Sequence, residues 1–176
     1  MASIPLKTIN GNVFALDAGH TPMLGVAMVD LPDLQNETEN MSGFGILGTY
    51  EAPLIGHFQD ADVSFHFHTI TQDAYQLGRQ TVRNIEVRTS IQFYDTAQQI
   101  FVPTPARYSF KTFPKQVNWG KIEPNKSQDW MVRLSCIAYI VYLNDVRVMQ
   151  MDKFGGISEM DGVDVLAPVR AQLGLS

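Results

Sequence analysis

The chain has 176 residues, of which 45% are hydrophobic and 18% charged, and its formal net charge is −5. This composition is typical of a single folded domain spanning residues 1–176 and excludes wholesale disorder. The acidic balance argues against a nucleic-acid binder, and the lack of an apolar run of about 18 residues and of a signal-peptide pattern argues against a membrane span and a secretion signal.

The first predicted elements lead into an unusual apolar segment. Residues 26–31 have the composition of a short strand, which Pro32 closes because proline cannot donate to a strand ladder. Residues 33–40 (DLQNETEN) are polar and acidic. Residues 41–58 (MSGFGILGTYEAPLIGHF) combine four glycines and Pro53 with many apolar side chains. The glycines and the proline disfavour a regular element, so we predict a long loop or an irregular hairpin arm.

Segment 41–58 is apolar, although loops normally run over the polar surface of a protein. Water is a poor environment for such a segment, and an exposed apolar patch of this kind marks an interface. We therefore predict an inter-subunit assembly loop that projects from the domain and is buried by another copy of the chain. Its apolar residues are Met41, Phe44, Ile46, Leu47, Tyr50, Leu54, Ile55 and Phe58.

Two strands with one apolar and one polar face are predicted in the middle of the chain, in segments 63–69 and 82–95. Between them, residues 71–80 favour one or two helical turns with Thr71 as N-cap. An antiparallel sheet that packs on a core with one side and meets water with the other needs such strands. The polar faces consist of Ser64, His66 and His68 in the first strand and of Glu86, Arg88, Ser90 and Gln92 in the second.

Further strands are predicted in segments 107–113, 130–143 and 146–151. Asn144-Asp145 suits a tight hairpin turn because both residues tolerate a positive φ. The lone Cys136 lies in an apolar run, which predicts a buried thiol and leaves no partner for an internal disulfide. In residues 161–176, apolar side chains recur at helical spacing, with Asp161 or Asp164 as N-cap and Pro168 shortening or kinking the helix. These elements make a mainly β protein of two packed antiparallel sheets with one or two short helices.

Charge is unevenly distributed along the chain. Residues 1–78 contain nine acidic residues and one basic residue, Lys7, whereas residues 79–133 contain nine basic and four acidic residues. One interpretation is that solvated surfaces happen to cluster by sign. The other is that an acidic face docks on a basic face of the next subunit, which favours head-to-tail assembly.

No motif for catalysis, a cofactor or a metal ion stands out. Gly43, Gly45 and Gly48 spell G-x-G-x-x-G, but a dinucleotide site needs a strand before the motif and a long helix after it. His66 and His68 lack a third ligand nearby, and no nucleophile or paired-carboxylate motif occurs. We therefore expect no enzyme, no cofactor and no metal site. An alternative function is a monomeric β-sandwich that binds a ligand or carbohydrate through Trp119, Trp130 and Tyr50.

Three stretches of the chain resemble the major tail tube proteins of contractile-tailed bacteriophages and R-type bacteriocins. The first leads from Leu31-Pro32 through the acidic spacer into MSGFGILGTYEAPLIG. The second is VRNIEVRTSIQFYD with the aromatic run that follows it. The third is the C-terminal VRVMQMDKFGGISEMDGVDVLAPVRAQLGL, in which a strand ending in Asp152 precedes GVD and an R-x-x-L-G-L helix. The resemblance extends from about Leu31 to the C-terminus.

The resemblance implies two β-sheets packed roughly at right angles in a sandwich or barrel, with a helix alongside. It also implies hexameric rings that extend the inner sheet from subunit to subunit and stack head to tail into a tube. Segment 41–58 would bridge to the next ring, and one of the two polar strand faces would line the lumen. DNA would pass in a phage, and the tube would serve membrane puncture in a bacteriocin (tailocin).

The implied partners are further copies of the chain, the tail sheath, a baseplate tube-initiator, a tail terminator, a tape-measure protein, and DNA in transit without sequence-specific binding. The implied location is the virion tail or tailocin particle, after assembly in the bacterial host cytoplasm.

Overall fold

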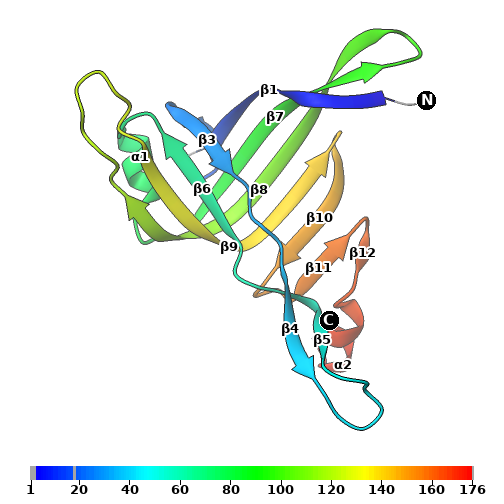
Figure 1. The fold of residues 1–176 in the computed structure, drawn as a ribbon. Coiled ribbons are helices and arrows are strands. Elements are labelled where there is room, and N and C mark those ends of the chain that lie inside the picture. Colours follow the sequence, from blue (N-terminus) through cyan, green and yellow to red (C-terminus); the bar gives the residue numbers. More distant parts are fainter. Residues whose placement is uncertain (1–2, 18, 176) are drawn as a thin grey trace.

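The computed structural model describes residues 3–17 and 19–175 and is built mainly from antiparallel strands (Figure 1). Two short helices, α1 (Gln72–Leu77) and α2 (Ala167–Gln172), accompany them. The strands are β1 (Ser3–Ala15), β2 (Thr21–Pro22), β3 (Val26–Asp30), β4 (Asn36–Met41), β5 (Tyr50–Phe58), β6 (Asp62–Phe67), β7 (Arg83–Asp95), β8 (Ile100–Asn118), β9 (Trp130–Leu143), β10 (Val146–Asp152), β11 (Ile157–Met160) and β12 (Val163–Asp164). The predicted fold class, a mainly β protein with two sheets and two short helices, is confirmed.

The larger sheet has ten strands and divides at β9. Its main path runs β12-β11-β10-β9-β8-β7-β1-β2. One edge of β9 pairs with β8 along most of its length. The other edge pairs with β6 at residues 130–135 and with β10 at residues 138–143. Because β6 and β10 share one edge, β6 and its neighbour β3 fold over and lie in front of β7 and β8 in Figure 1.

The core lies between these two layers of the larger sheet. It takes Val63, Phe65 and Phe67 from β6, which are the apolar face predicted for segment 63–69. Opposite them lie Ile85 and Val87 of β7, the start of the apolar face predicted for segment 82–95. The remaining core residues include Trp130, Val132 and Leu134 of β9, Phe110 of β8, Val13 of β1, and Ala74 and Leu77 of α1. Strand alternation in the sequence therefore identifies the core face of both layers.

The structure confirms two features that the sequence predicts from a few adjacent residues, a helix cap and a hairpin turn. The Thr71 side chain accepts a hydrogen bond from Ala74 N, 3.1 Å away, and caps α1 as predicted. Asn144 and Asp145 have φ values of 50° and 60°, so the β9–β10 hairpin turns through two residues in the left-handed region. Cys136 is buried, and burial raises the pKa of its thiol to about 12.

The C-terminal segment differs from the helix predicted over residues 161–176. Val163–Asp164 instead forms β12, paired with β11, and the helix spans only Ala167–Gln172. Pro168 lies in its first turn, where the missing N–H costs no hydrogen bond, so proline starts the helix instead of kinking it. Neither Asp161 nor Asp164 is its N-cap, because Leu166 occupies that position. Ser176 of the predicted range lies outside the described residues.

The smaller sheet is a ribbon of two strands, β4 and β5, that projects away from the larger sheet (Figure 1). Segment 33–40, predicted as a polar lead, contributes β4, while segment 41–58 contributes the turn and β5. Thr38 lies opposite Pro53. Pro53 is tolerated because β5 is an edge strand whose one neighbour in the described chain is β4. The hairpin-arm alternative for segment 41–58 is therefore the correct one.

Candidate assembly surfaces

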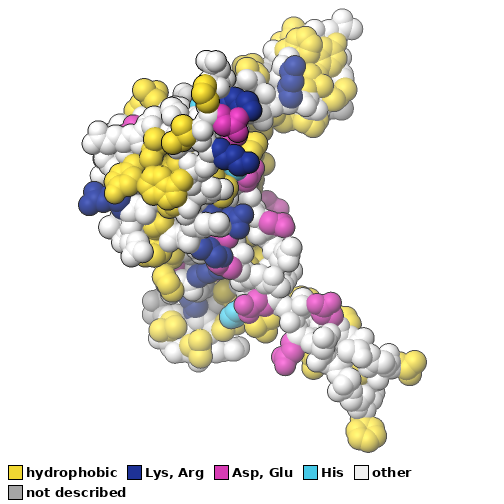
Figure 2. Space-filling view, turned by 60° about the vertical axis from the view of Figure 1, so that its left-hand side comes forward, with side chains coloured by type: hydrophobic (Ala, Val, Ile, Leu, Met, Phe, Trp, Pro, Cys, Tyr) yellow, Lys and Arg dark blue, Asp and Glu magenta, His cyan; other side chains and the backbone are white. Residues whose placement is uncertain are grey.

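The ribbon, residues 36–58, exposes its apolar side chains to solvent. Phe44 and Leu47 at its turn are fully exposed. Met41, Ile46, Tyr50, Leu54 and Ile55 are also exposed, whereas Phe58 packs against the core. Figure 2 shows the ribbon as the lower projection, with hydrophobic side chains at its end. Seven of the eight predicted loop residues thus form a surface that the subunit itself does not cover.

Backbone geometry keeps the ribbon turn in the open. Gly45 and Gly48 have φ values of 89° and 93°, a region that strongly favours glycine. A Cβ added at either position would meet no atom within 4 Å. Ile46 N donates to Gly43 O at 3.1 Å, which closes a local turn. The turn is therefore shaped by its own backbone and rests on no other part of the described chain.

The ribbon base packs beside the C-terminal segment. Gly56 has a φ of 72°, and a Cβ there would lie 2.6 Å from side-chain atoms of Leu166. A groove of about 460 Å³ opens at this junction, lined by Gly56, His57 and Phe58 on the ribbon side and by Leu166, Val169 and Leu173 on the other, among further residues. The α2 segment is tied down by Arg170, which donates to Asp164 Oδ2 and to Gly156 O, each at 2.7 Å. That hydrogen bond from Arg170 lowers the pKa of Asp164.

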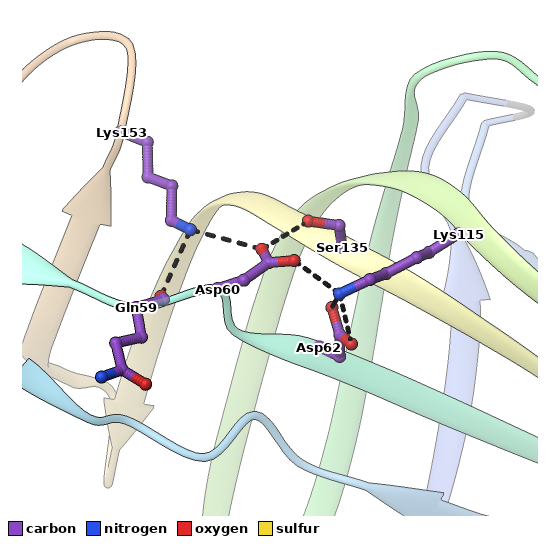
Figure 3. A network of polar contacts seen from close by, with 6 residues as sticks. All are labelled: Gln59, Asp60, Asp62, Lys115, Ser135 and Lys153. Carbon is purple, nitrogen blue, oxygen red and sulfur yellow. Dashed lines mark hydrogen bonds and ion pairs between the residues drawn. The ribbon is translucent and has the colours of Figure 1, made fainter. Parts of the chain in front are cut away.

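A cluster of charged groups holds the chain where it leaves the ribbon (Figure 3). Lys115 of β8 donates to Asp60 Oδ2 at 2.6 Å and to Asp62 Oδ2 at 3.0 Å. Lys153, which follows β10, donates to Gln59 O at 3.3 Å and lies 3.4 Å from Asp60 Oδ1. Ser135 donates to Asp60 Oδ1 at 2.8 Å.

The cluster fixes the protonation state of Asp60. The hydrogen bond from Lys115 is the largest cause that lowers the pKa of Asp60 from 3.8 to about 2. The same contact raises the pKa of Lys115. Both groups thus stay charged across the neutral range, and residues 59–62 are tied to β8, β9 and the segment after β10.

The two polar strand faces predicted as lumen candidates point away from the common core, on different layers. On β6, Ser64 is buried because β3 and β9 flank it on both sides. His66 is half-buried, with Nε2 2.9 Å from Asp30 Oδ2. His68 is exposed and lies beyond the end of the strand. The prediction of a solvent-exposed face is therefore wrong at Ser64. The structure does not bring Ser64, His66 and His68 together with the polar residues predicted on β7.

On β7, the side chain of Glu86 is buried, with 4% of its surface exposed, although strand alternation predicts that it faces solvent. Its carboxylate accepts from Arg88 Nε at 2.5 Å and from Ser109 Oγ at 3.2 Å, and it lies 4.0 Å from Arg107 Nη1. The two guanidinium groups stack over the rings of Phe14 and Tyr142, at 5.3 Å and 4.0 Å from the centroids. Ser90 and Gln92 are half-buried. On this face, one buried carboxylate thus offsets one of the two arginine charges.

The acidic and basic blocks of the sequence partly neutralise each other within the subunit. Lys115 pairs with Asp60 and Asp62, and Arg83 lies 3.9 Å from Asp17. The ribbon keeps its acidity, because residues 36–58 contain three glutamates and no lysine or arginine. Docking of an acidic face on a basic face of the next subunit remains a prediction for the ribbon.

Two exposed apolar surfaces escaped the sequence reasoning. We call the first the arm: the free end of β1 with the adjoining β7–β8 hairpin, where Ile4, Leu6, Ile9, Ile100 and Phe101 are exposed. It forms the upper projection in Figure 2. The second is α2, none of whose residues is buried. The apolar residues Ile4, Leu6 and Ile9 near the start of the chain were the available signal for the arm.

The structure also shows where the residues considered for other kinds of site lie. The G-x-G-x-x-G glycines lie in the turn of a two-stranded ribbon, without the helix that a dinucleotide site requires. Within residues 3–17 and 19–175, no cluster of three or more His, Cys, Asp or Glu is placed to hold a metal ion. No helix in the described part is long and apolar enough to cross a membrane. Of the three aromatic residues of the alternative carbohydrate platform, Trp130 is fully buried and cannot serve, whereas Trp119 and Tyr50 are exposed.

Comparison with known proteins decides the family. The family described as phage tail tube protein FII matches residues 8–174. This chain belongs to that family. As a tail tube protein it is a structural component of a tail, in agreement with the resemblance seen in the sequence. Among curated proteins, none matches the sequence.

Solved structures show that the tail tube protein shares its fold with a component of a contractile injection system. A chain of the PVC sheath/tube terminator, from an extracellular contractile injection system in the extended state, aligns with a TM-score of 0.52 and 13% identity over 78% of this chain and 96% of that chain. A chain of the PVC sheath-tube complex in the extended state aligns with a TM-score of 0.49 and 12% identity over 80% and 91%. A chain of the anti-feeding prophage baseplate gives 0.42 and 9% over 81% and 91%.

Proposed function

We propose that this tail tube protein forms hexameric rings that stack head to tail into the inner tube of a contractile phage tail or tailocin. The observation that carries the proposal is the ribbon, whose apolar turn is fully exposed and projects from the rest of the subunit. An exposed apolar surface of this kind marks an interaction site, and its burial by another chain would favour association. A contact between two different surfaces repeats from copy to copy, so it builds rings where the rotation closes and filaments where it does not.

The same proposal includes the partners of such a tube. A tail sheath, a baseplate tube-initiator, a tail terminator and a tape-measure protein would contact it, and assembly would take place in the bacterial host cytoplasm. The similarity in fold to a chain of a sheath/tube terminator is compatible with these partners. DNA would pass without sequence-specific binding, or the tube would serve membrane puncture.

We propose the outer face of β7 for the lumen, because β7 lies on the main strand path of the larger sheet, whereas β6 pairs with β9 off that path. Adhesion of nucleic acid depends on lysine and arginine side chains that neutralise phosphates. Arg88 of β7 and Arg107 of the neighbouring strand β8 share the carboxylate of Glu86. The carboxylate offsets one of these two positive charges, so a polyanion sliding over the face would be held less strongly than by two unpaired arginines.

Deletion of residues 49–55 tests the proposal. The deletion removes most of β5, which belongs to the separate two-stranded sheet, so we expect a folded subunit with the circular dichroism spectrum of a β protein. We expect the wild-type chain to form long tubes in electron micrographs and the deletion variant to form none. Long tubes from the deletion variant would refute the bridging role of the ribbon, and a wild-type chain that stays monomeric at high concentration would refute the tube.

A further inference from the structure

Strand β1 contains an asparagine that is followed by glycine. Asn10 is the only asparagine of the sequence with glycine after it. An asparagine loses its amide when the backbone nitrogen of the next residue attacks the side-chain carbon, and glycine hinders that attack least because it has no Cβ. Both Asn10 and Gly11 are exposed on β1. The reaction in the folded protein therefore depends on whether the strand leaves the Gly11 nitrogen free.

Strand pairing directs the N–H group of Gly11 away from β7. In an antiparallel pair, the backbone groups of successive residues point alternately toward the partner strand and away from it. Leu16 N donates to Asn84 O at 2.9 Å, so Leu16 points toward β7 and the odd-numbered residues before it point away. Val13 agrees, because its carbonyl accepts from Met23 N at 2.8 Å, on the side opposite β7. No register shift interrupts the pairing over this stretch, so Gly11 also points away.

The outer edge of β1 is open at Gly11. Strand β2 pairs only with Phe14 and Ala15, and no other described strand pairs with this edge. A groove of about 480 Å³ along the edge, lined by Asn10 and Gly11 among further residues, admits water. Gly11 N donates to Asn10 Oδ1 at 2.8 Å. The fold thus leaves this nitrogen outside the sheet ladder and holds the side-chain carboxamide of Asn10 against it.

We propose that Asn10 is a site of spontaneous deamidation in the folded subunit. The Gly11 nitrogen forms a bond to Cγ of Asn10, and the bond from Cγ to Nδ2 breaks. The proton that the backbone nitrogen loses ends on the departing ammonia, and a cyclic imide remains. Water then opens this ring at either of its two carbonyl carbons. One opening gives aspartate, and the other gives isoaspartate, in which the main chain runs through the former side chain.

The modification changes the end of β1 that forms part of the arm. Isoaspartate adds a carbon atom to the backbone at residue 10, and residues 3–8, which pair with residues 91–95, lie beyond it. The added atom shifts these residues against β7, and both products add a negative charge to the open edge. The subunit therefore changes with age at this edge. The proposal is independent of the proposed function, since the reaction needs only the folded subunit and water.

Peptide mapping of the wild-type subunit tests the site. Asn12 is the matched internal control: it is exposed on the same strand, and the Val13 N–H after it also points away from β7, but Val13 is branched and buried. The folded chain is kept at mildly alkaline pH, because the nitrogen attacks in its deprotonated form, and samples are analysed by mass spectrometry. We expect Asn10 to convert at least about tenfold faster than Asn12, a difference of about 1.4 kcal/mol in the activation barrier, and to give both aspartate and isoaspartate.

The variant Asn10→Gln separates cyclisation from simple hydrolysis. Glutamine keeps an exposed amide but closes a larger ring more slowly, so we expect conversion at residue 10 to disappear while the urea midpoint is unchanged. Gly11→Ala is a poorer choice, because a Cβ there would lie 3.0 Å from Thr89 Cγ2. Equal rates at Asn10 and Asn12, aspartate as the only product, conversion of the glutamine variant at the wild-type rate, or conversion only in urea would each overturn the proposal.

Discussion

Replacing Phe44 and Leu47 together by serine removes the apolar end of the ribbon without touching the core. Both side chains are fully exposed in the subunit, so the variant should unfold at the same urea concentration as the wild type. The change therefore acts on assembly alone, which makes it a cleaner test of the ribbon than a deletion.

The expected loss follows from the area that a neighbouring subunit would cover. Full burial of a phenylalanine or leucine side chain contributes about 1.5–3 kcal/mol, so the two together contribute about 3–6 kcal/mol to each ring-to-ring contact. Since about 1.4 kcal/mol corresponds to a factor of ten, the concentration needed for tube growth should rise by about 10²- to 10⁴-fold. Half burial would still give a rise of about 10- to 10²-fold.

Pelleting of tubes over a range of protein concentrations measures that threshold. The matched control is Ser42→Ala with Thr49→Ala, which changes two exposed polar residues of the same turn and should leave the threshold within about twofold. A threshold equal to that of the wild type in the serine variant would show that no neighbour buries these side chains, and the reasoning from exposure to assembly would be wrong.

Three further predictions concern the base of the ribbon and the core. Gly56→Ala should lower the free energy of unfolding, measured in urea, by more than about 1 kcal/mol, because Gly56 has a positive φ and the added Cβ would collide with Leu166. An unchanged urea midpoint would show that the ribbon base and the C-terminal segment can move apart. The lowered pKa of Asp60 gives stability that is present above its ordinary value of 3.8 and lost as the pH falls toward about 2. Lys115→Met should make this loss of stability at low pH smaller, and it should lower the free energy of unfolding at neutral pH by less than about 1 kcal/mol, because Lys115 and Asp60 are both about half exposed. Urea unfolding curves at several pH values measure both effects. An identical pH dependence of stability in the variant and the wild type would contradict the prediction. Cys136, whose pKa burial raises to about 12, should react with a thiol reagent only in denaturant, and rapid labelling of the folded chain would contradict its burial.

The sequence predicts those features that depend on near neighbours along the chain. Strand alternation identifies Phe65 and Ile85 as core residues because side chains of a strand alternate between its faces. The Thr71 cap and the Asn144-Asp145 turn are correct because each depends on a few adjacent residues. The exposed apolar ribbon is predictable for a similar reason: its glycines and Pro53 disfavour burial in a regular sheet, whatever the rest of the chain does.

Features that need a distant partner appear only in the tertiary structure. The strand β1 exists because it pairs with β7, about 80 residues away, and its bulges set the direction of Leu6 and Ile9. Glu86 alternates as a polar residue, yet Arg88 and Ser109 enclose it once β7 and β8 pair. The C-terminal segment has helical spacing, but pairing of β12 with β11 withdraws its first residues from the helix. In each case the sequence fixes what a side chain is, whereas long-range pairing decides which neighbours it has and whether water reaches it.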